Sequence, residues 1–207
     1  MIRTQLDLRT EASRAAALAQ RGGAVEIRAA SAADREAIKS FVMALSLRSR
    51  FLRFFSPVAL PTSALLRGMC GAGPGTDALV ATVDGVIVGH AMASDVTGPD
   101  GRPVADIGLV VADRWQGRGL GSQLLSRVIA RAAARGVSGL VMEVLPENRR
   151  MLAMIARGFA GAGYEFGGGS VTVRVPLPGP AAAGRGREAE GGREGRDSSR
   201  AAAVWAA

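Results

Sequence analysis

Apolar side chains recur every three or four positions through residues 119–135, and Gly136 follows the last of them. This spacing is typical of an amphipathic helix with one buried face, and a glycine commonly ends such a helix. Residues 119–135 are therefore predicted to form a helix. The apolar positions of its buried face are Leu120, Leu124, Leu125, Val128 and Ala132.

Short apolar runs separated by turn residues predict the strands of the chain. These strands are expected at residues 24–30, 77–83, 86–94, 103–113 and 138–145, with a closing hairpin over 163–177. Three further helices are expected at 31–45, 61–70 and 147–157, and residues 48–57 are expected to form a loop. The order β-α-α-β-β-β-α-β-α-β-β indicates an α/β domain with a mixed sheet.

Composition divides the chain into a folded part and two different ends. Residues 24–177 carry the alternating elements, and we expect them to form one domain. Residues 1–23 are an N-terminal extension of mixed charge and alanine. Residues 178–207 consist mainly of Pro, Gly, Ala and charged residues with almost nothing to bury, so we expect a disordered C-terminal tail.

Several classes of protein are excluded by composition. The extension lacks the apolar core of a signal peptide, and no run of about 18 apolar residues occurs elsewhere, so we expect a cytoplasmic protein without a membrane partner. A single cysteine, Cys70, excludes an internal disulfide, and no metal-ligand spacing is found, so no metal is expected. The net charge of +8 suits an anionic partner, but aromatic residues make up only 4%, which argues against nucleic acid.

The segment "RWQGRGLGSQLL", residues 114–125, places three glycines and two arginines at the start of the predicted helix. Glycine allows backbone amides to approach a ligand closely, and unpaired amides at a helix N-terminus attract anions. Arg114 and Arg118 add positive charge. A phosphate-binding site is therefore predicted at this position.

Other interpretations of these glycines are weaker. A P-loop requires a lysine that the segment lacks. The series Gly117-x-Gly119-x-x-Ser122 nearly matches the dinucleotide fingerprint, but that fingerprint follows the first strand of a parallel unit, whereas several strands precede this one. A loop that serves packing alone remains the structural alternative.

The run Gln116–Gly121 matches the Q/R-x-x-G-x-G/A pyrophosphate motif of the GCN5-related N-acetyltransferases (GNAT), and it follows the fourth predicted strand, as in that family. The resemblance covers about residues 25–177. The segments "SLRSRFLRFF", "VVADRWQGRGLGSQLL" and "VLPENRRML" together are similar to the bacterial protein-lysine acetyltransferase domain within this family.

This resemblance implies the GNAT fold, in which a mostly antiparallel sheet has splayed fourth and fifth strands and flanking helices. It also implies an enzyme that moves an acetyl group from acetyl-CoA to an amine, with a protein lysine side chain as the expected acceptor. Acetylation of a small-molecule amine, and a non-catalytic module that binds acyl-CoA, are the two alternatives.

The resemblance assigns several residues to acetyl-CoA. Backbone amides of the glycine-rich segment would hold the pyrophosphate, and Val111 would pair its backbone with pantetheine. Asn148 would lie near the pantetheine arm, although an ordinary helix cap accounts for it equally well. Where many members carry a tyrosine acid, this chain has Ile155. The full set implied for acetyl-CoA is Leu109, Val110, Val111, Gln116, Gly117, Arg118, Gly119, Leu120, Gly121, Ser122 and Asn148.

Transfer to a lysine requires a base, because an ε-amine with a pKa near 10.4 costs about 4.6 kcal/mol to deprotonate at pH 7. Asp106, Glu143 and His90 are the candidates near the splayed strands. In the protein-lysine subfamily a glutamate on the fourth strand takes this role, and the resemblance places Asp106 at that position. A water can bridge the missing methylene. Asp106 is therefore the predicted base, and Glu143 is the alternative.

Residues 48–55, "RSRFLRFF", combine arginines with three phenylalanines. We expect Phe51, Phe54 and Phe55 to belong to the core, and a wall of the acceptor pocket is the alternative. The resembling family has acceptor contacts in this region, which keeps Arg50 and Arg53 as candidates for such contacts.

Overall fold

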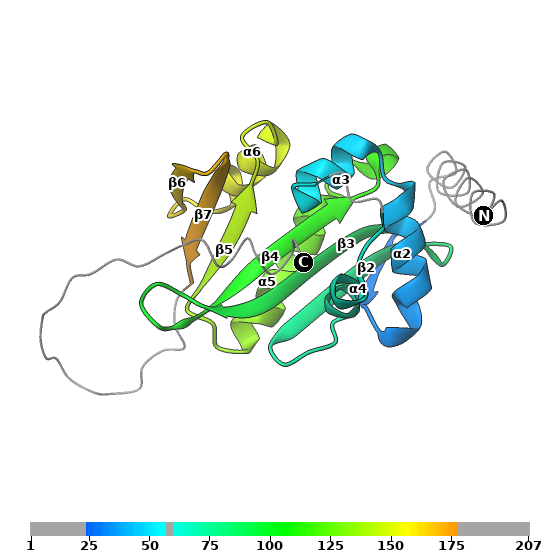
Figure 1. The fold of residues 1–207 in the computed structure, drawn as a ribbon, viewed down its shortest axis with the longest axis horizontal. Coiled ribbons are helices and arrows are strands. Elements are labelled where there is room, and N and C mark those ends of the chain that lie inside the picture. The colour runs from blue at the N-terminus through cyan, green and yellow to red at the C-terminus, as the bar shows by residue number, and fades with distance from the viewer. Residues whose placement is uncertain (1–23, 57–59, 178–207) are drawn as a thin grey trace, which may run out of the picture.

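The computed structural model describes residues 24–56 and 60–177, which form one seven-stranded sheet with helices on both faces (Figure 1). The predictions for residues 1–23 and 178–207 lie outside the described residues. The strand order is β1-β2-β3-β4-β5-β7-β6. The strands are β1 (Glu26–Ala29), β2 (Thr76–Val83), β3 (Val86–Thr97), β4 (Pro103–Val111), β5 (Gly139–Val144), β6 (Gly163–Gly167) and β7 (Ser170–Pro176).

The helices connect these strands in nearly the predicted order. They are η1 (Ala32–Asp34), α2 (Arg35–Ala44), α3 (Leu47–Phe54), α4 (Ser63–Met69), η2 (Asp113–Trp115), α5 (Leu120–Ala134) and α6 (Arg149–Gly158). None of the helices in the described part of the chain is long and apolar enough to cross a membrane.

Helix α3 corrects the prediction of a loop over residues 48–57. The Ser46 side chain caps this helix by accepting the N–H of Ser49 at 3.1 Å. Phe54 is buried at its other end, and Phe55 ends the helix with a left-handed φ of 60°. A side-chain cap and packing stabilise this short helix, so residues 48–57 lack the long apolar stripe that predicts a helix from sequence.

The sheet opens between β4 and β5, which run parallel to each other. Their register joins Ala105 to Leu140 and Asp106 to Val141, and the pairing stops there among the described residues. β4 nevertheless continues to Val111. The two strands diverge beyond Asp106, as Figure 1 shows, which confirms the predicted splayed sheet.

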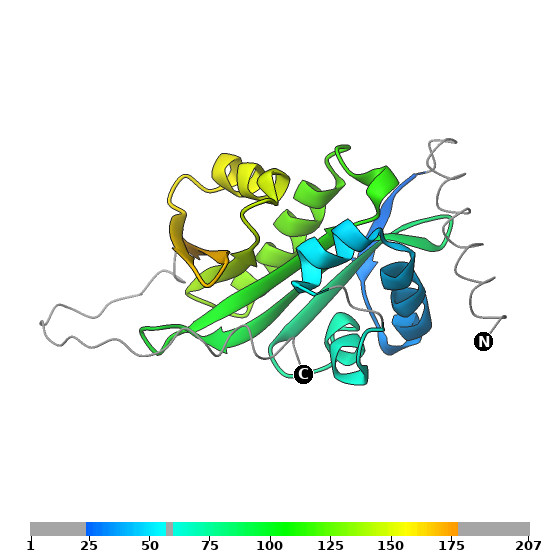
Figure 2. The same ribbon diagram turned by 45° about the horizontal axis from the view of Figure 1, so that its top comes forward.

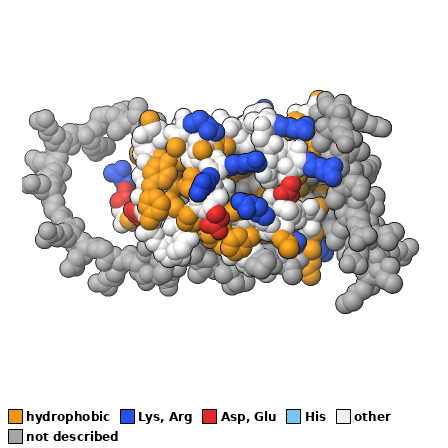
Figure 3. All heavy atoms as spheres, turned by 90° about the horizontal axis from the view of Figure 1, so that it is seen from above, with side chains coloured by type: hydrophobic (Ala, Val, Ile, Leu, Met, Phe, Trp, Pro, Cys, Tyr) orange, Lys and Arg blue, Asp and Glu red, His pale blue; other side chains and the backbone are white. Residues whose placement is uncertain are grey.

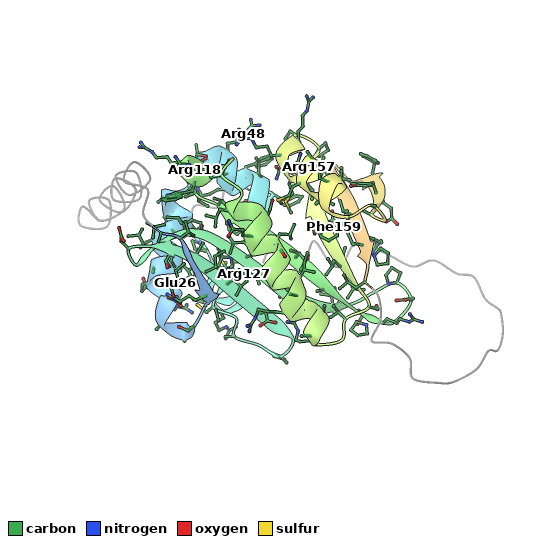
Figure 4. The ribbon with its side chains drawn as sticks, turned by 180° about the vertical axis from the view of Figure 1, so that it is seen from behind. Glu26, Arg48, Arg118, Arg127, Arg157 and Phe159 are labelled. Carbon is green, nitrogen blue, oxygen red and sulfur yellow. The ribbon has the colours of Figure 1, made fainter. Side chains whose placement is uncertain are left out.

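Each face of the sheet has its own apolar core. α5 and α6 cover one face, where Leu124, Met142 and Ile155 are buried, and Figure 4 shows α5 running diagonally across it. α2, α3 and α4 lie over the other face, with Ile38 and Met92 buried there. Figures 1 and 2 show that these three helices cover the β2–β4 side and leave β5, β7 and β6 without a covering helix on that face.

A β-bulge in β3 allows α5 to pack closely against the sheet. The β2–β3 register shifts between Ala81 and Thr82, which leaves Val88 as an extra residue on β3. At the neighbouring Gly89, an added Cβ would lie 2.8 Å from Cδ1 of Leu124, so a larger residue would push α5 away. This close approach holds the start of α5 against the end of β4.

An ion pair joins β1 to the start of α2. Arg28 Nη2 lies 2.6 Å from Asp34 Oδ1, and the Ser31 N–H donates to Asp34 Oδ2 at 2.8 Å. The hydrogen bond from Arg28, the largest influence, lowers the pKa of Asp34 to about 2, although burial opposes this shift. Because the folded pKa is depressed, Asp34 stabilises the fold above about pH 4, and this stabilisation is lost as the pH falls toward about 2.

Asp34→Asn is therefore expected to lower the free energy of unfolding by about 2 kcal/mol at pH 7 and to flatten its pH dependence between about pH 4 and pH 2. Urea denaturation at several pH values measures both effects. Glu36→Gln is the matched control, because the exposed Glu36 pairs with Lys39 at 3.6 Å and such surface pairs contribute little. Equal losses in the two variants would contradict this role of Asp34.

Candidate active site

The glycine-rich segment 116–122 leads from the end of β4 into α5. Gly117 and Gly119 have φ values of 76° and 80°, in the left-handed region that favours glycine. Gly119 is the N-cap of α5, and its carbonyl accepts the N–H of Gln123 at 3.2 Å, so the amides ahead of Gln123 point out of the helix end. A Cβ added at either glycine would meet no described atom within 4 Å. The segment thus presents exposed backbone amides of the kind that bind anions, and phosphate binding here stays a prediction.

Basic side chains surround this segment. Arg114 and Arg118 are exposed, and Arg118 Cζ lies 5.3 Å from the centre of the Trp115 ring. Figure 4 shows Arg48 of α3 and Arg157 of α6 at the same end of the molecule as Arg118. Figure 3 looks onto this end, where basic side chains outnumber acidic ones. The positive charge gathered here attracts polyphosphates.

The edge of β4 that faces the diverging β5 carries backbone hydrogen-bonding groups. The Ala112 N–H donates to Val88 O on β3 at 2.9 Å. Because these groups alternate in direction along a strand, Leu109 and Val111 direct theirs away from β3. Gln116 Nε2 donates to the Val111 carbonyl at 3.0 Å. Leu109 and the Val111 amide therefore line the edge predicted for pantetheine, whereas the Val111 carbonyl binds Gln116.

The Gln116 side chain connects three elements around the open edge. Besides Val111, its Nε2 donates to Ser49 Oγ of α3 at 3.1 Å, and its Oε1 accepts from Arg150 Nη1 of α6 at 3.2 Å. The first residue of the glycine motif therefore holds β4, α3 and α6 together. The motif alone did not indicate this second role.

Asp113 fixes the start of α3 to the end of β4. Ser46 Oγ and Ser49 Oγ donate to its Oδ1 at 2.6 and 2.7 Å, and the Ser46 N–H donates to its Oδ2 at 3.0 Å. Burial raises the pKa of Asp113, but the hydrogen bonds from both serines outweigh burial and lower that pKa below its ordinary value. The carboxylate stays ionised at neutral pH and anchors α3 beside the open edge.

The predicted base, Asp106, lies on β4 at the last position that pairs with β5. Its half-buried side chain shares a face of the sheet with Gly108 and Val110, and this face is the one opposite α5. Arg53 of α3 is its charged neighbour. Burial, the larger influence, lowers the pKa of the Arg53 guanidinium, and the negative charge of Asp106 raises it. The carboxylate thus lies where the two strands separate.

The other two candidates for the base already have hydrogen-bond partners. Ser170 Oγ and Thr172 Oγ1 donate to the Glu143 carboxylate at 2.7 and 2.6 Å. His90 is fully buried, its Nε2 donates to the Met69 carbonyl at 2.8 Å, and burial lowers its pKa to about 4. His90 is therefore neutral and shielded from an acceptor, which leaves Glu143 as the alternative base. Among the described residues, no three His, Cys, Asp or Glu side chains cluster to hold a metal ion.

Asn148 forms the helix cap that was one of its two expected roles. Its Oδ1 accepts the N–H of Met151 at 3.3 Å at the start of α6. A contact with pantetheine stays a prediction. Ile155, at the position where many GNAT members carry a tyrosine acid, is fully buried on the same helix.

The three phenylalanines near α3 separate into two groups. Phe54 is 8% exposed and belongs to the core beneath α3, as predicted. Phe51 and Phe55 are 37% and 39% exposed, so the prediction that they belong to the core is wrong. Their side chains lie at the surface because the short helix buries only one face.

A mixed sheet opened between two parallel strands, with a glycine-rich helix start beside the opening, defines the GNAT fold. A family model described as the acetyltransferase (GNAT) family matches residues 45–159, which is more than half of the chain. The chain therefore belongs to the acetyltransferase (GNAT) family.

Solved structures share this fold. The GNAT domain of PAT from S. lividans superposes with a TM-score of 0.66 at 27% identity, covering 76% of this chain and 93% of that chain. A phosphinothricin acetyltransferase of the GNAT superfamily from Sinorhizobium meliloti, in complex with AcCoA, gives a TM-score of 0.59 at 21% identity, over 79% of this chain and 94% of that chain. At this lower identity the second structure shows the fold alone.

A curated relative matches a shorter stretch. The L-amino acid N-acetyltransferase AaaT of Escherichia coli (strain K12) is 41% identical over 56 residues, which are 27% of this chain. The chain matches only 35% of the length of that relative.

Sequence analysis missed the side chains that support the site from a distance. Ser49 and Asp113 lie far apart in the chain, and their hydrogen bond depends on α3, which was not predicted. The position of Arg53 had a signal in Gly108, because glycine within a strand often marks the close approach of another group.

Proposed function

We propose that this protein transfers the acetyl group of acetyl-CoA to an amine, with a protein lysine side chain as the acceptor. The observation that carries the proposal is that β4–β5 pairing ends at Asp106, next to the glycine-rich start of α5. A carboxylate and an open backbone edge therefore follow one another along β4, and the glycine-rich segment comes after them at the start of α5. Membership of the acetyltransferase (GNAT) family supports acetyl transfer and leaves the acceptor to be argued separately.

The described residues fit acetyl-CoA. The backbone amides between Gln116 and Ser122 would bind the pyrophosphate, because the space outside Gly117 and Gly119 is open. The backbone of Leu109 and the amide of Val111 would hydrogen-bond to the pantetheine arm along the open edge. Bound in this way, acetyl-CoA supplies a thioester activated for transfer.

Asp106 would act as the general base. It accepts one proton from the acceptor ammonium, directly or through one water, so that the neutral nitrogen can form its bond to the acetyl carbon while the carbon–sulfur bond breaks. The second proton that the nitrogen gives up as the amide forms passes to solvent. Ile155 offers no proton at the position of the usual tyrosine acid. A thiol has an ordinary pKa near 8.5, so the departing thiolate can take its proton from solvent.

The choice of a protein lysine as acceptor rests on the open face of the sheet. On the side where Asp106 and Glu143 lie, no described helix covers β5, β7 and β6 (Figure 2). A lysine projecting from another protein can approach such a face, and its ammonium is attracted by the two carboxylates. The resemblance of the sequence to the bacterial protein-lysine acetyltransferase domain also supports this acceptor.

A small-molecule amine is the second candidate acceptor, because the relative matched over 56 residues is named an L-amino acid N-acetyltransferase. An amino acid would be acetylated at its α-amine, whereas the proposed acceptor reacts at an ε-amine.

Release of the CoA thiol upon addition of an acceptor tests the proposal. We expect turnover with a peptide that has a blocked N-terminus and one lysine, and none with the matched peptide in which arginine replaces that lysine. Mass spectrometry should locate the acetyl group on the lysine nitrogen. Turnover with free amino acids but not with the lysine peptide would favour the second candidate, and acetyl-CoA binding without any turnover would contradict an enzymatic role.

A further inference from the structure

Gly108 leaves a notch in the middle of β4 that the Arg53 side chain of α3 fills. A Cβ added at Gly108 would lie 3.0 Å or less from three atoms of Arg53, namely Nη1, Nη2 and Cζ. Glycine is the only residue that leaves room for the guanidinium at this position, because every other residue has a Cβ. Gly108 is two residues from Asp106 on the same face of the sheet, so the notch sets the guanidinium beside that carboxylate.

The Arg53 guanidinium is largely removed from water. Its Nε is buried without a hydrogen-bond partner, and its Cζ lies 5.1 Å from the centre of the Phe54 ring. Burial lowers the pKa of this guanidinium, and Asp106 is the acid whose charge opposes that effect. A buried cation is costly unless an anion balances it. The negative charge of Asp106 therefore acts on the buried Arg53 guanidinium from the same face of β4.

We propose that Arg53 is a positioning residue for Asp106: seated on Gly108, its guanidinium lies on the same face of β4 as the carboxylate and balances its negative charge. This inference rests on the proposed function, in which Asp106 is the base. It adds a reason for the glycine within β4 and a role for an arginine that the motifs do not include.

Three elements that contact β4 carry charged or titratable groups. Arg50 and Arg53 come from α3, His90 from β3 and Glu143 from β5. His90 is neutral above about pH 4, and Glu143 accepts hydrogen bonds from two hydroxyl groups. Neither His90 nor Glu143 is a cation at neutral pH, so neither can supply a positive charge to Asp106, and Arg50 is the second cation of α3.

The inference predicts a specific change in the pH profile. Without the cation, the charged form of Asp106 is less favoured, so the carboxylate takes up a proton at higher pH. The acid limb of kcat/KM should therefore move upward by about one pH unit or more in Arg53→Met. Arg53→Lys, which keeps the charge, should restore most of the original profile. Gly108→Ala should shift the limb in the same direction as Arg53→Met, because it displaces the guanidinium without removing it.

Thiol release measured from about pH 5 to pH 9, with melting temperatures and acetyl-CoA affinity for each variant, tests this inference. Arg67→Met on α4 is the matched control, since Arg67 is exposed and should leave the profile unchanged. If Gly108→Ala does not fold, the Gly108→Ala/Arg53→Met double variant should fold, because the added methyl group then has space. An acid limb that stays in place in Arg53→Met would overturn the inference.

The double variant Arg53→Met/Asp106→Asn separates this inference from the proposed function. If Arg53 acts through Asp106, the double variant should be no slower than Asp106→Asn alone, whereas independent roles would multiply the two losses. A multiplied loss overturns the role of Arg53 and leaves Asp106 as the base. Full activity of Asp106→Asn would instead overturn the base itself.

Discussion

Asp106→Asn is expected to lower kcat/KM for acetyl transfer by about 10²-fold or more at neutral pH, with acetyl-CoA affinity nearly unchanged. Asparagine has the shape of aspartate but cannot accept a proton. The side chain lies where β4 and β5 separate and not among the amides of the glycine-rich segment, so donor binding should not depend on its charge. Steady-state thiol release and calorimetry with acetyl-CoA measure the two quantities.

Two further results would identify the lost function as proton removal. Raising the pH should partly restore Asp106→Asn, because more of an acceptor amine with a pKa near 10.4 is then neutral. Asp106→Glu, which keeps the carboxylate and lengthens its reach, should retain activity at or above the starting level. A fully active Asp106→Asn protein would contradict the role of Asp106 as the base. Glu143 would then be the candidate base, and Glu143→Gln is the corresponding test.

The parts of the fold that the sequence predicted well depend on local patterns. The apolar stripe of residues 119–135 predicted α5, because the period of a helix can be seen in the spacing of apolar residues along the sequence. Asp84-Gly85 predicted the β2–β3 turn, where both residues have positive φ. The positive φ angles of Gly117 and Gly119 are likewise a local property, which the glycines themselves indicate.

The parts that escaped prediction depend on contacts between distant segments. α3 begins at Ser46, whose hydroxyl group is held by Asp113 from the end of β4. Arg53 reaches Gly108 only because α3 lies across β4, which no local spacing reveals. Such contacts support the candidate site from outside the motifs. Sequence motifs alone therefore describe the part predicted for acetyl-CoA better than the part predicted for the acceptor.

Gly119→Val is expected to raise the dissociation constant for acetyl-CoA about tenfold or more, because the anion site depends on amides that only a left-handed residue positions. The φ of 80° at Gly119 is strained for valine, and the added side chain would enter the open space predicted for the pyrophosphate. Gly136→Val at the opposite end of α5 is the matched control, with a φ of 87° and equally open surroundings. Both variants should lose similar thermal stability, but only Gly119→Val should lose affinity in calorimetry. Unchanged affinity in a folded Gly119→Val protein, or an equal loss of affinity in Gly136→Val, would remove the phosphate site from the start of α5.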